Sequence, residues 1–309
     1  MRTPDFKRLP GFAKIYLGAW GERIAFISTI LGLFGALLAY LIVGGEFLAN
    51  LLSPFFGGGN FLYTFLYFCL GAILIFFGIK IIAKVEFWGL ILFFLILLVI
   101  FWQGQQFLKI GNLFPVLDKK YLFLPYGAIL FSLWGASLIP EVEEMLGEKK
   151  ALLKKVIVTA TLLPILVYFF FIYFILGITG SQTAESAITG LRNILGEKIV
   201  ALGLFIGVLT TFTSFIALGL TLKKVFMYDL KIGKFLAWAA TCFVPLFLFF
   251  LGFQNFINVI SLVGGIMLGI DGILILLMYQ KATKKKFVYP LALIFLAGIL
   301  YEIIYFIKF

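Results

Sequence analysis

Long apolar segments, separated by short polar or basic loops, run along almost the whole chain. Most of these segments approach the roughly 20 apolar residues that a helix needs to cross the hydrocarbon core of a bilayer. The pattern therefore predicts an all-α membrane protein, a polytopic bundle of about nine transmembrane helices. The predicted spans cover residues 24–49, 61–82, 87–102, 121–145, 156–178, 199–222, 235–251, 256–279 and 287–307.

The residues before the first span form a short amphipathic segment. Apolar residues recur at the spacing of one helix face from Phe12 to Trp20, whereas Lys14 and Arg23 lie off that stripe. This spacing predicts a helix that lies in the membrane interface. No apolar core of a cleavable signal peptide follows the first basic residues, so we expect the first span to direct insertion. The predicted organisation is a cytoplasmic interfacial segment over residues 1–23 and a single transmembrane domain over residues 24–309.

The composition agrees with this class and excludes others. Hydrophobic residues make up 63% of the chain and charged residues only 13%, with a mean hydropathy of +1.15. The net charge of +11 does not indicate a nucleic-acid partner, because the charges lie between apolar runs and not in one basic patch. Without histidine, and with both cysteines inside apolar stretches, neither a disulfide framework nor a cysteine/histidine metal site is expected.

Lysine and arginine are distributed unequally between alternate loops. They concentrate before the first span and around the ends of the second, fourth, sixth and eighth spans. Because cytoplasmic loops carry an excess of Lys and Arg, these segments and the N-terminus are predicted to be cytoplasmic. We expect a multi-pass protein of the cell membrane, in a bacterium the inner membrane. The basic residues on the other side are Lys109, Lys119, Lys120, Arg192, Lys198 and Lys308.

The fourth predicted span differs from the others because it contains Pro125, Pro140 and two glycines. Proline is tolerated without strain only in the first turn of a helix, so a helix is expected to begin near Ser137, with its hydroxyl as the N-cap. The chain is then non-helical over residues 133–136. Transporters use such broken helices to bind substrates near the midplane. A proline kink without function is the alternative.

Polar residues inside other spans are candidates for ion coupling. The hydroxyls of Thr210, Thr211 and Ser214 could coordinate a cation or the substrate, although close helix packing explains most of the small-residue stripe around them. A carboxylate in hydrocarbon is costly, which makes Asp271 a candidate proton site, with a structural hydrogen bond as the alternative. Glu46 and Glu302 lie nearer the ends of their spans, where a snorkelling or solvated position is expected.

An acidic cluster follows the broken span. Glu141, Glu143 and Glu144 come directly after Pro140 and precede a basic run over residues 149–155. This arrangement predicts an ion network or a gate at the cytoplasmic end of the broken helix.

Three segments carry a resemblance to a known transporter family, namely FSLWGASLIPEVEEM at the break, GLFGALLAYLIVGGEFL in the first span and SFIALGLTLKKVF in the sixth. With them the chain resembles the bacterial aromatic amino acid permeases. These belong to the hydroxy and aromatic amino acid permeases, in the group that shares the LeuT-type inverted-repeat fold. The resemblance runs over essentially the whole chain from Arg2. It implies that residues 131–140 are the family's sixth, discontinuous helix, and that the spans from 24, 199 and 256 are its third, eighth and tenth.

The resemblance also implies where substrate and ion bind. The implied substrate-binding residues are Ser132, Gly135, Ala136, Ser137 and Tyr40. The implied ion-coupling residues are Thr211, Ser214 and Asp271, of which the hydroxyls favour sodium and the carboxyl favours a proton. No catalytic residue, metal ion or other cofactor is expected. The expected partners are an amino acid substrate and the lipid bilayer, and the sequence leaves the oligomeric state open.

The family pattern begins with two further helices, the first of them broken, and the chain has neither. We therefore expect either a start upstream of Met1 or a fragment or degenerate copy. The predicted function is a secondary active transporter of an aromatic or other hydrophobic amino acid, coupled to protons or sodium. The alternative is a non-transporting membrane scaffold or sensor. An enzyme is not expected, because no nucleophile, base or metal set converges, and no ATP-binding motif is present.

Overall fold

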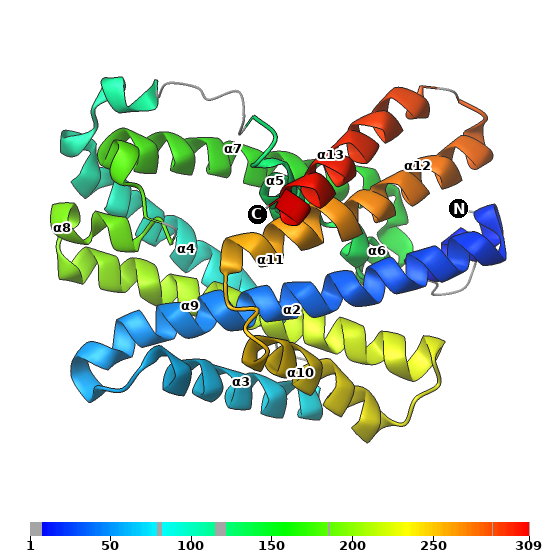
Figure 1. The fold of residues 1–309 in the computed structure, drawn as a ribbon, viewed down its shortest axis with the longest axis horizontal. Helices are drawn as coiled ribbons and strands as arrows, with labels where there is room; N and C mark the ends of the chain where they lie inside the picture. Colours follow the sequence, from blue (N-terminus) through cyan, green and yellow to red (C-terminus); the bar gives the residue numbers. More distant parts are fainter. Residues whose placement is uncertain (1–7, 79–81, 115–121, 185, 286, 309) are drawn as a thin grey trace. The chain divides into compact units, whose positions relative to one another are not determined.

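A computed structural model describes residues 8–78, 82–114, 122–184, 186–285 and 287–308. Within these residues every regular element is a helix (Figure 1). Seven of the described helical segments are long and apolar enough to cross a bilayer. Two shorter apolar segments, Tyr126–Leu138 and Lys234–Phe250, occupy the positions of the remaining predicted spans. The prediction of a polytopic helical membrane protein is therefore confirmed.

The helices follow the predicted spans closely, with differences of a few residues at the ends. In chain order they are α1 (Leu9–Leu17), α2 (Ala19–Phe56), α3 (Asn60–Phe77), α4 (Ile82–Gly104), α5 (Tyr126–Leu133), α6 (Ile139–Leu146), α7 (Leu153–Thr179), α8 (Arg192–Leu195), α9 (Glu197–Lys224), α10 (Lys234–Phe250), α11 (Phe256–Leu262), α12 (Gly269–Thr283) and α13 (Val288–Lys308). The π-helical turn η8 (Val225–Asp229) continues α9. A second π-helical turn, η9 (Val263–Leu268), joins α11 to α12.

The chain divides into two compact units, each described by itself here. Unit 1 contains Met1–Gly32, Leu117–Phe169 and Ile260–Phe309, and unit 2 contains Leu33–Val116 and Phe170–Val259. Both units combine segments that are distant in sequence. The single transmembrane domain over residues 24–309 stays a prediction.

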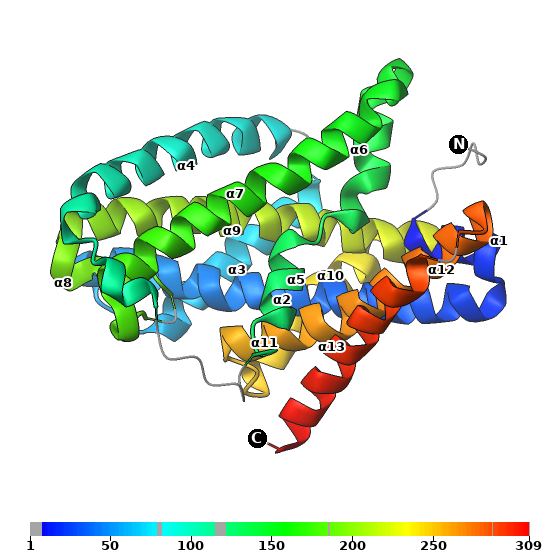
Figure 2. The same ribbon diagram turned by 90° about the horizontal axis from the view of Figure 1, so that it is seen from above.

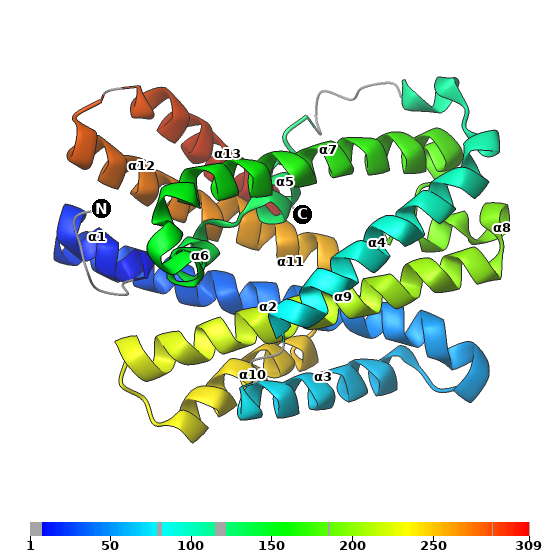
Figure 3. The same cartoon turned by 180° about the vertical axis from the view of Figure 1, so that it is seen from behind.

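In unit 1, α12 and α13 lie side by side, with α1 along α12 and α5 against η9 (Figures 1 and 3). The short helix predicted before the first span is present as α1, and its position in the membrane interface stays a prediction. Ala13 and Leu17 pack against Leu274 and Met278 of α12, whereas Ile15 is exposed. The expected stripe ends early, because Gly18 adopts a left-handed φ of +81° between α1 and α2.

In unit 2, α9 contacts α3, α4 and α10. Aromatic side chains fill much of the space between these helices. The Tyr67 ring of α3 meets the edges of Phe212 and Phe215 of α9, with ring centroids 5.2 and 5.7 Å apart. A second cluster of buried side chains, around Ile100, Phe174 and Leu204, joins α4, α7 and α9.

Candidate functional site

The break in the fourth predicted span is present in the structure. Figure 2 shows α5 and α6 as separate coils. The first helix ends at Leu133, and Trp134 is extended, with φ −82° and ψ 102°. A 3-10 turn over Ala136–Leu138 follows, and α6 begins at Ile139 with Pro140 in its first turn. Proline fits there because the first-turn N–H groups have no partner inside the helix.

The capping prediction for Ser137 is wrong. The residue at the N-cap of α6 is Leu138, and no side chain caps the helix. The 3-10 turn replaces the cap, since the Leu138 N–H donates to the Gly135 carbonyl at 3.1 Å.

The break brings four of the predicted substrate residues, Ser132 to Ser137, into one accessible stretch of unit 1. Ser132 and Gly135 are exposed, and Ala136 and Ser137 are half-buried. A Cβ added at Gly135 would meet no atom within 4 Å. The stretch is held by its backbone, because the Tyr168 hydroxyl of α7 donates to the Ser132 carbonyl at 3.1 Å. Apart from Leu133 and Trp134, which are half-buried, the stretch therefore presents small side chains and backbone groups to open space.

The remaining predicted site residues, apart from Asp271, lie in unit 2, on α2 and α9. Tyr40 is half-buried on α2. The Thr211 hydroxyl of α9 donates to the Gly207 carbonyl at 2.7 Å, one turn earlier, and Ser214 is half-buried on the same helix. Their roles in substrate binding and ion coupling stay predictions, as does the role of the stretch in unit 1.

Asp271 is buried in unit 1, with 4% of its surface exposed. The Ser28 hydroxyl of α2 donates a hydrogen bond to its carboxylate. Ser28 is itself buried, so this bond lies away from water and links α2 to α12. The structure thus contains the hydrogen bond between helices that the sequence offered as the alternative, and a role in ion coupling stays a prediction.

The expectation for Glu302 is wrong. Its side chain is 0% exposed, in contrast to a snorkelling or solvated carboxylate. Glycines of neighbouring elements make room for it, because a Cβ at Gly265 would lie 2.9 Å from its Cδ atom. Because Glu302 lies near the end of its predicted span, the burial of its side chain was not expected. The adjacent glycines at 264 and 265 are the signal that could have revealed a side chain buried against that helix.

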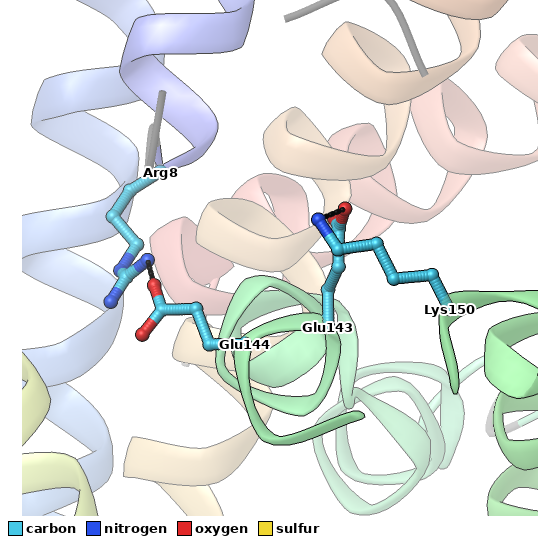
Figure 4. A network of polar contacts seen from close by, with 4 residues as sticks. All are labelled: Arg8, Glu143, Glu144 and Lys150. Atoms are coloured by element: carbon cyan, nitrogen blue, oxygen red, sulfur yellow. Dashed lines mark hydrogen bonds and ion pairs between the residues drawn. The ribbon is translucent and has the colours of Figure 1, made fainter. Parts of the chain in front are cut away.

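An ion network lies at the end of α6, as the acidic cluster predicted (Figure 4). Arg8, which precedes α1, pairs with Glu144 at 3.0 Å, and Lys150 pairs with Glu143 at 3.2 Å. The side chain of Glu141 lies outside the described residues. The Arg8–Glu144 pair is the less exposed of the two, at 17% and 35%, against 57% and 24% for Lys150–Glu143. It ties the segment before α1 to the second half of the broken helix.

We expect a double-mutant cycle with Arg8→Ala and Glu144→Ala to give a coupling energy of about 1 kcal/mol in thermal unfolding, near the upper end for exposed pairs. Partial burial reduces screening by solvent and salt. The same cycle on Lys150 and Glu143 serves as the matched control and should give a smaller value. Equal coupling in the two cycles would show that burial of the Arg8 pair adds nothing.

Comparison with known proteins identifies the family to which the chain is similar. Residues 4–306 match the sequence profile of the tryptophan/tyrosine permease family. Comparison with curated proteins finds no match.

Proposed function

Since the chain belongs to the tryptophan/tyrosine permease family, whose members are amino acid permeases, we propose that it is a secondary active transporter that binds an aromatic or other hydrophobic amino acid at the break between α5 and α6. The observation that carries this proposal is the accessible break between α5 and the 3-10 turn, in which Trp134 and Gly135 are non-helical, a shorter range than the predicted 133–136. Unwound backbone inside a membrane span is sustained only where it lines protein or a water-filled cavity.

The chemistry of the break suits a zwitterionic amino acid. The carbonyl groups at the end of α5 carry partial negative charge and can accept from a substrate ammonium group. The N–H groups at the start of the following helical turns carry partial positive charge and can donate to a substrate carboxylate. The small residues Gly135 and Ala136 leave space for an aromatic side chain.

We place the coupling ion at residues that could hold either a proton or sodium. Thr211 and Ser214 supply hydroxyl oxygens of the kind that coordinate sodium, and Asp271 supplies a carboxyl group for a proton. The LeuT-type inverted-repeat fold and the position in the inner membrane, with the N-terminus in the cytoplasm, belong to the same proposal. The distribution of lysine and arginine supports the orientation.

The test is uptake of radiolabelled tryptophan, tyrosine and phenylalanine into proteoliposomes under an imposed proton or sodium gradient. Wild type is expected to accumulate at least one of them. Absence of gradient-driven uptake would contradict the transporter proposal and favour the scaffold or sensor.

Gly135→Leu is expected to lower uptake about tenfold or more, because the added side chain occupies the space in which the substrate would bind. Folding should be unaffected, since no atom lies within 4 Å of a Cβ at this position. Gly59→Leu, which also extends into open space but before α3, is the matched control and should transport like wild type. Equal uptake by the two variants would show that the substrate does not bind at the break.

A further inference from the structure

A buried carboxyl group with no side-chain hydrogen bond in the described residues lies in unit 1, where the first half of the broken helix meets the π-helical turn η9. Glu302 of α13 is 0% exposed. The backbone N–H of Gly127 in α5 faces the carboxylate. Nevertheless, neither carboxylate oxygen makes a hydrogen bond with the residues that the structure describes. Asp271 differs in this respect, because its carboxylate accepts from Ser28.

The surroundings of Glu302 are shaped for a carboxyl group. A Cβ at Gly127 of α5 would lie 2.7 Å from Oε1 of Glu302, and a Cβ at Gly265 of η9 would overlap Cγ of the same side chain. Both neighbouring elements therefore lack a side chain where the carboxyl group lies. The Tyr126 hydroxyl of α5 is a second buried polar group without a hydrogen bond in the described structure.

No cation compensates this carboxyl group in the described residues around it. Tyr126 is the titratable residue of α5, and η9 (Val263–Leu268) has none. Asp271 of α12 is bonded to Ser28. On α13 itself the neighbouring titratable residues are Tyr301 and Tyr305, whose rings stack on each other at 6.2 Å. An ionised carboxylate in this environment is disfavoured, because it has lost water and the described residues around it supply no cation.

We propose that Glu302 is a proton-binding site whose occupancy is linked to the position of α5, and this inference rests on the proposed function. With α5 seated on η9, the carboxyl group carries a proton. When α5 moves away and water reaches the group, the proton is released. Since α5 ends at Leu133 and leads directly into the break, proton binding and substrate binding act on the same element, and any effect of one on the affinity for the other is reciprocal.

The first test measures protonation directly and does not depend on transport. Infrared difference spectra between acid and alkaline pH are recorded on the purified full chain in lipid nanodiscs, for wild type, Glu302→Gln and Asp271→Asn. Wild type is expected to show the carbonyl band of a protonated carboxyl group that is absent from Glu302→Gln and retained in Asp271→Asn. The same band in Glu302→Gln, or a Glu302 band that responds to sodium and not to pH, would overturn the proposal.

The second test separates coupling from substrate exchange in proteoliposomes. If one proton enters with each substrate, a membrane potential of about 100 mV drives about 50-fold accumulation by wild type. Glu302→Gln should lose proton-driven accumulation, because its amide cannot bind a proton, and Asp271→Asn, which removes the other candidate proton site, is the comparison. Counterflow, which needs no proton gradient, measures whether each variant still exchanges substrate. Proton-driven accumulation by Glu302→Gln at the wild-type level would overturn the proposal. A wild type that transports nothing would refute the proposed function, and the infrared measurement would still decide the proton site.

Glu302→Asp is the second variant in case glutamine prevents folding. Aspartate keeps a carboxyl group, but its shorter side chain places that group farther from Gly127 and Gly265. The pH at which the infrared band appears should therefore change. An unchanged pH dependence would show that the position of the carboxyl group does not matter, contrary to the proposal.

Discussion

Gly264→Ala is expected to destabilise unit 1 by about 3 kcal/mol or more, at or beyond the upper end for overpacking. A Cβ at this position would overlap the backbone carbonyl of Gly127 and lie 3.0 Å from Cβ of Phe131. Both obstacles belong to α5. A flexible side chain could rotate aside, but a helix backbone cannot, so α5 would have to leave η9. The measurement is thermal unfolding of the purified protein in detergent, with size-exclusion chromatography to detect aggregation.

Gly32→Ala is the matched control for this prediction. Gly32 also lies in a helix of unit 1, and a Cβ there would be 3.6 Å from Cβ of Met267, an ordinary contact distance. Alanine should therefore be neutral or stabilise the helix by up to about 1 kcal/mol through its higher helix propensity. Equal unfolding temperatures for the two variants would show that α5 is not held against η9 by the close approach at Gly264.

Lys223→Met is expected to lower the stability of unit 2 by about 1.5–3 kcal/mol, the range for hydrogen bonds to charged groups. The Lys223 ammonium group donates to the carbonyls of Ile75 and Phe76 at 2.8 and 3.0 Å. These carbonyls belong to the last turn of α3, which has no further helical N–H groups to satisfy them. Methionine keeps the length and the apolar stem but loses the donors. Thermal unfolding of the variant measures the difference.

Lys224→Met provides the comparison, since the neighbouring lysine is exposed. Its replacement should change stability by no more than about 0.5 kcal/mol, as is usual for surface positions. The two variants alter net charge equally, so a shared loss would indicate an effect of charge and not of the bonds to α3.

The sequence by itself determined which segments are helices and where one helix breaks. A membrane span must satisfy its backbone hydrogen bonds internally, so a run of apolar residues is sufficient to predict a helix. The break is equally local, because Pro140 must lie in a first helical turn. The ion network after α6 could also be anticipated, since its acidic residues and Lys150 are close in sequence, although the sequence did not indicate that Arg8 would join it.

Only the tertiary structure decided which polar groups are buried and what they contact. Ser28 meets Asp271 across more than two hundred residues of chain, and Glu302 lies between glycines of α5 and η9. Likewise, the packing of Ala13 and Leu17 of α1 against α12 was not indicated by the periodicity of α1. All spans are apolar on most sides, so hydrophobicity does not specify which face of a helix meets which neighbour. In a membrane that choice depends on the fit of small residues and polar groups between helices, which is a property of pairs of segments.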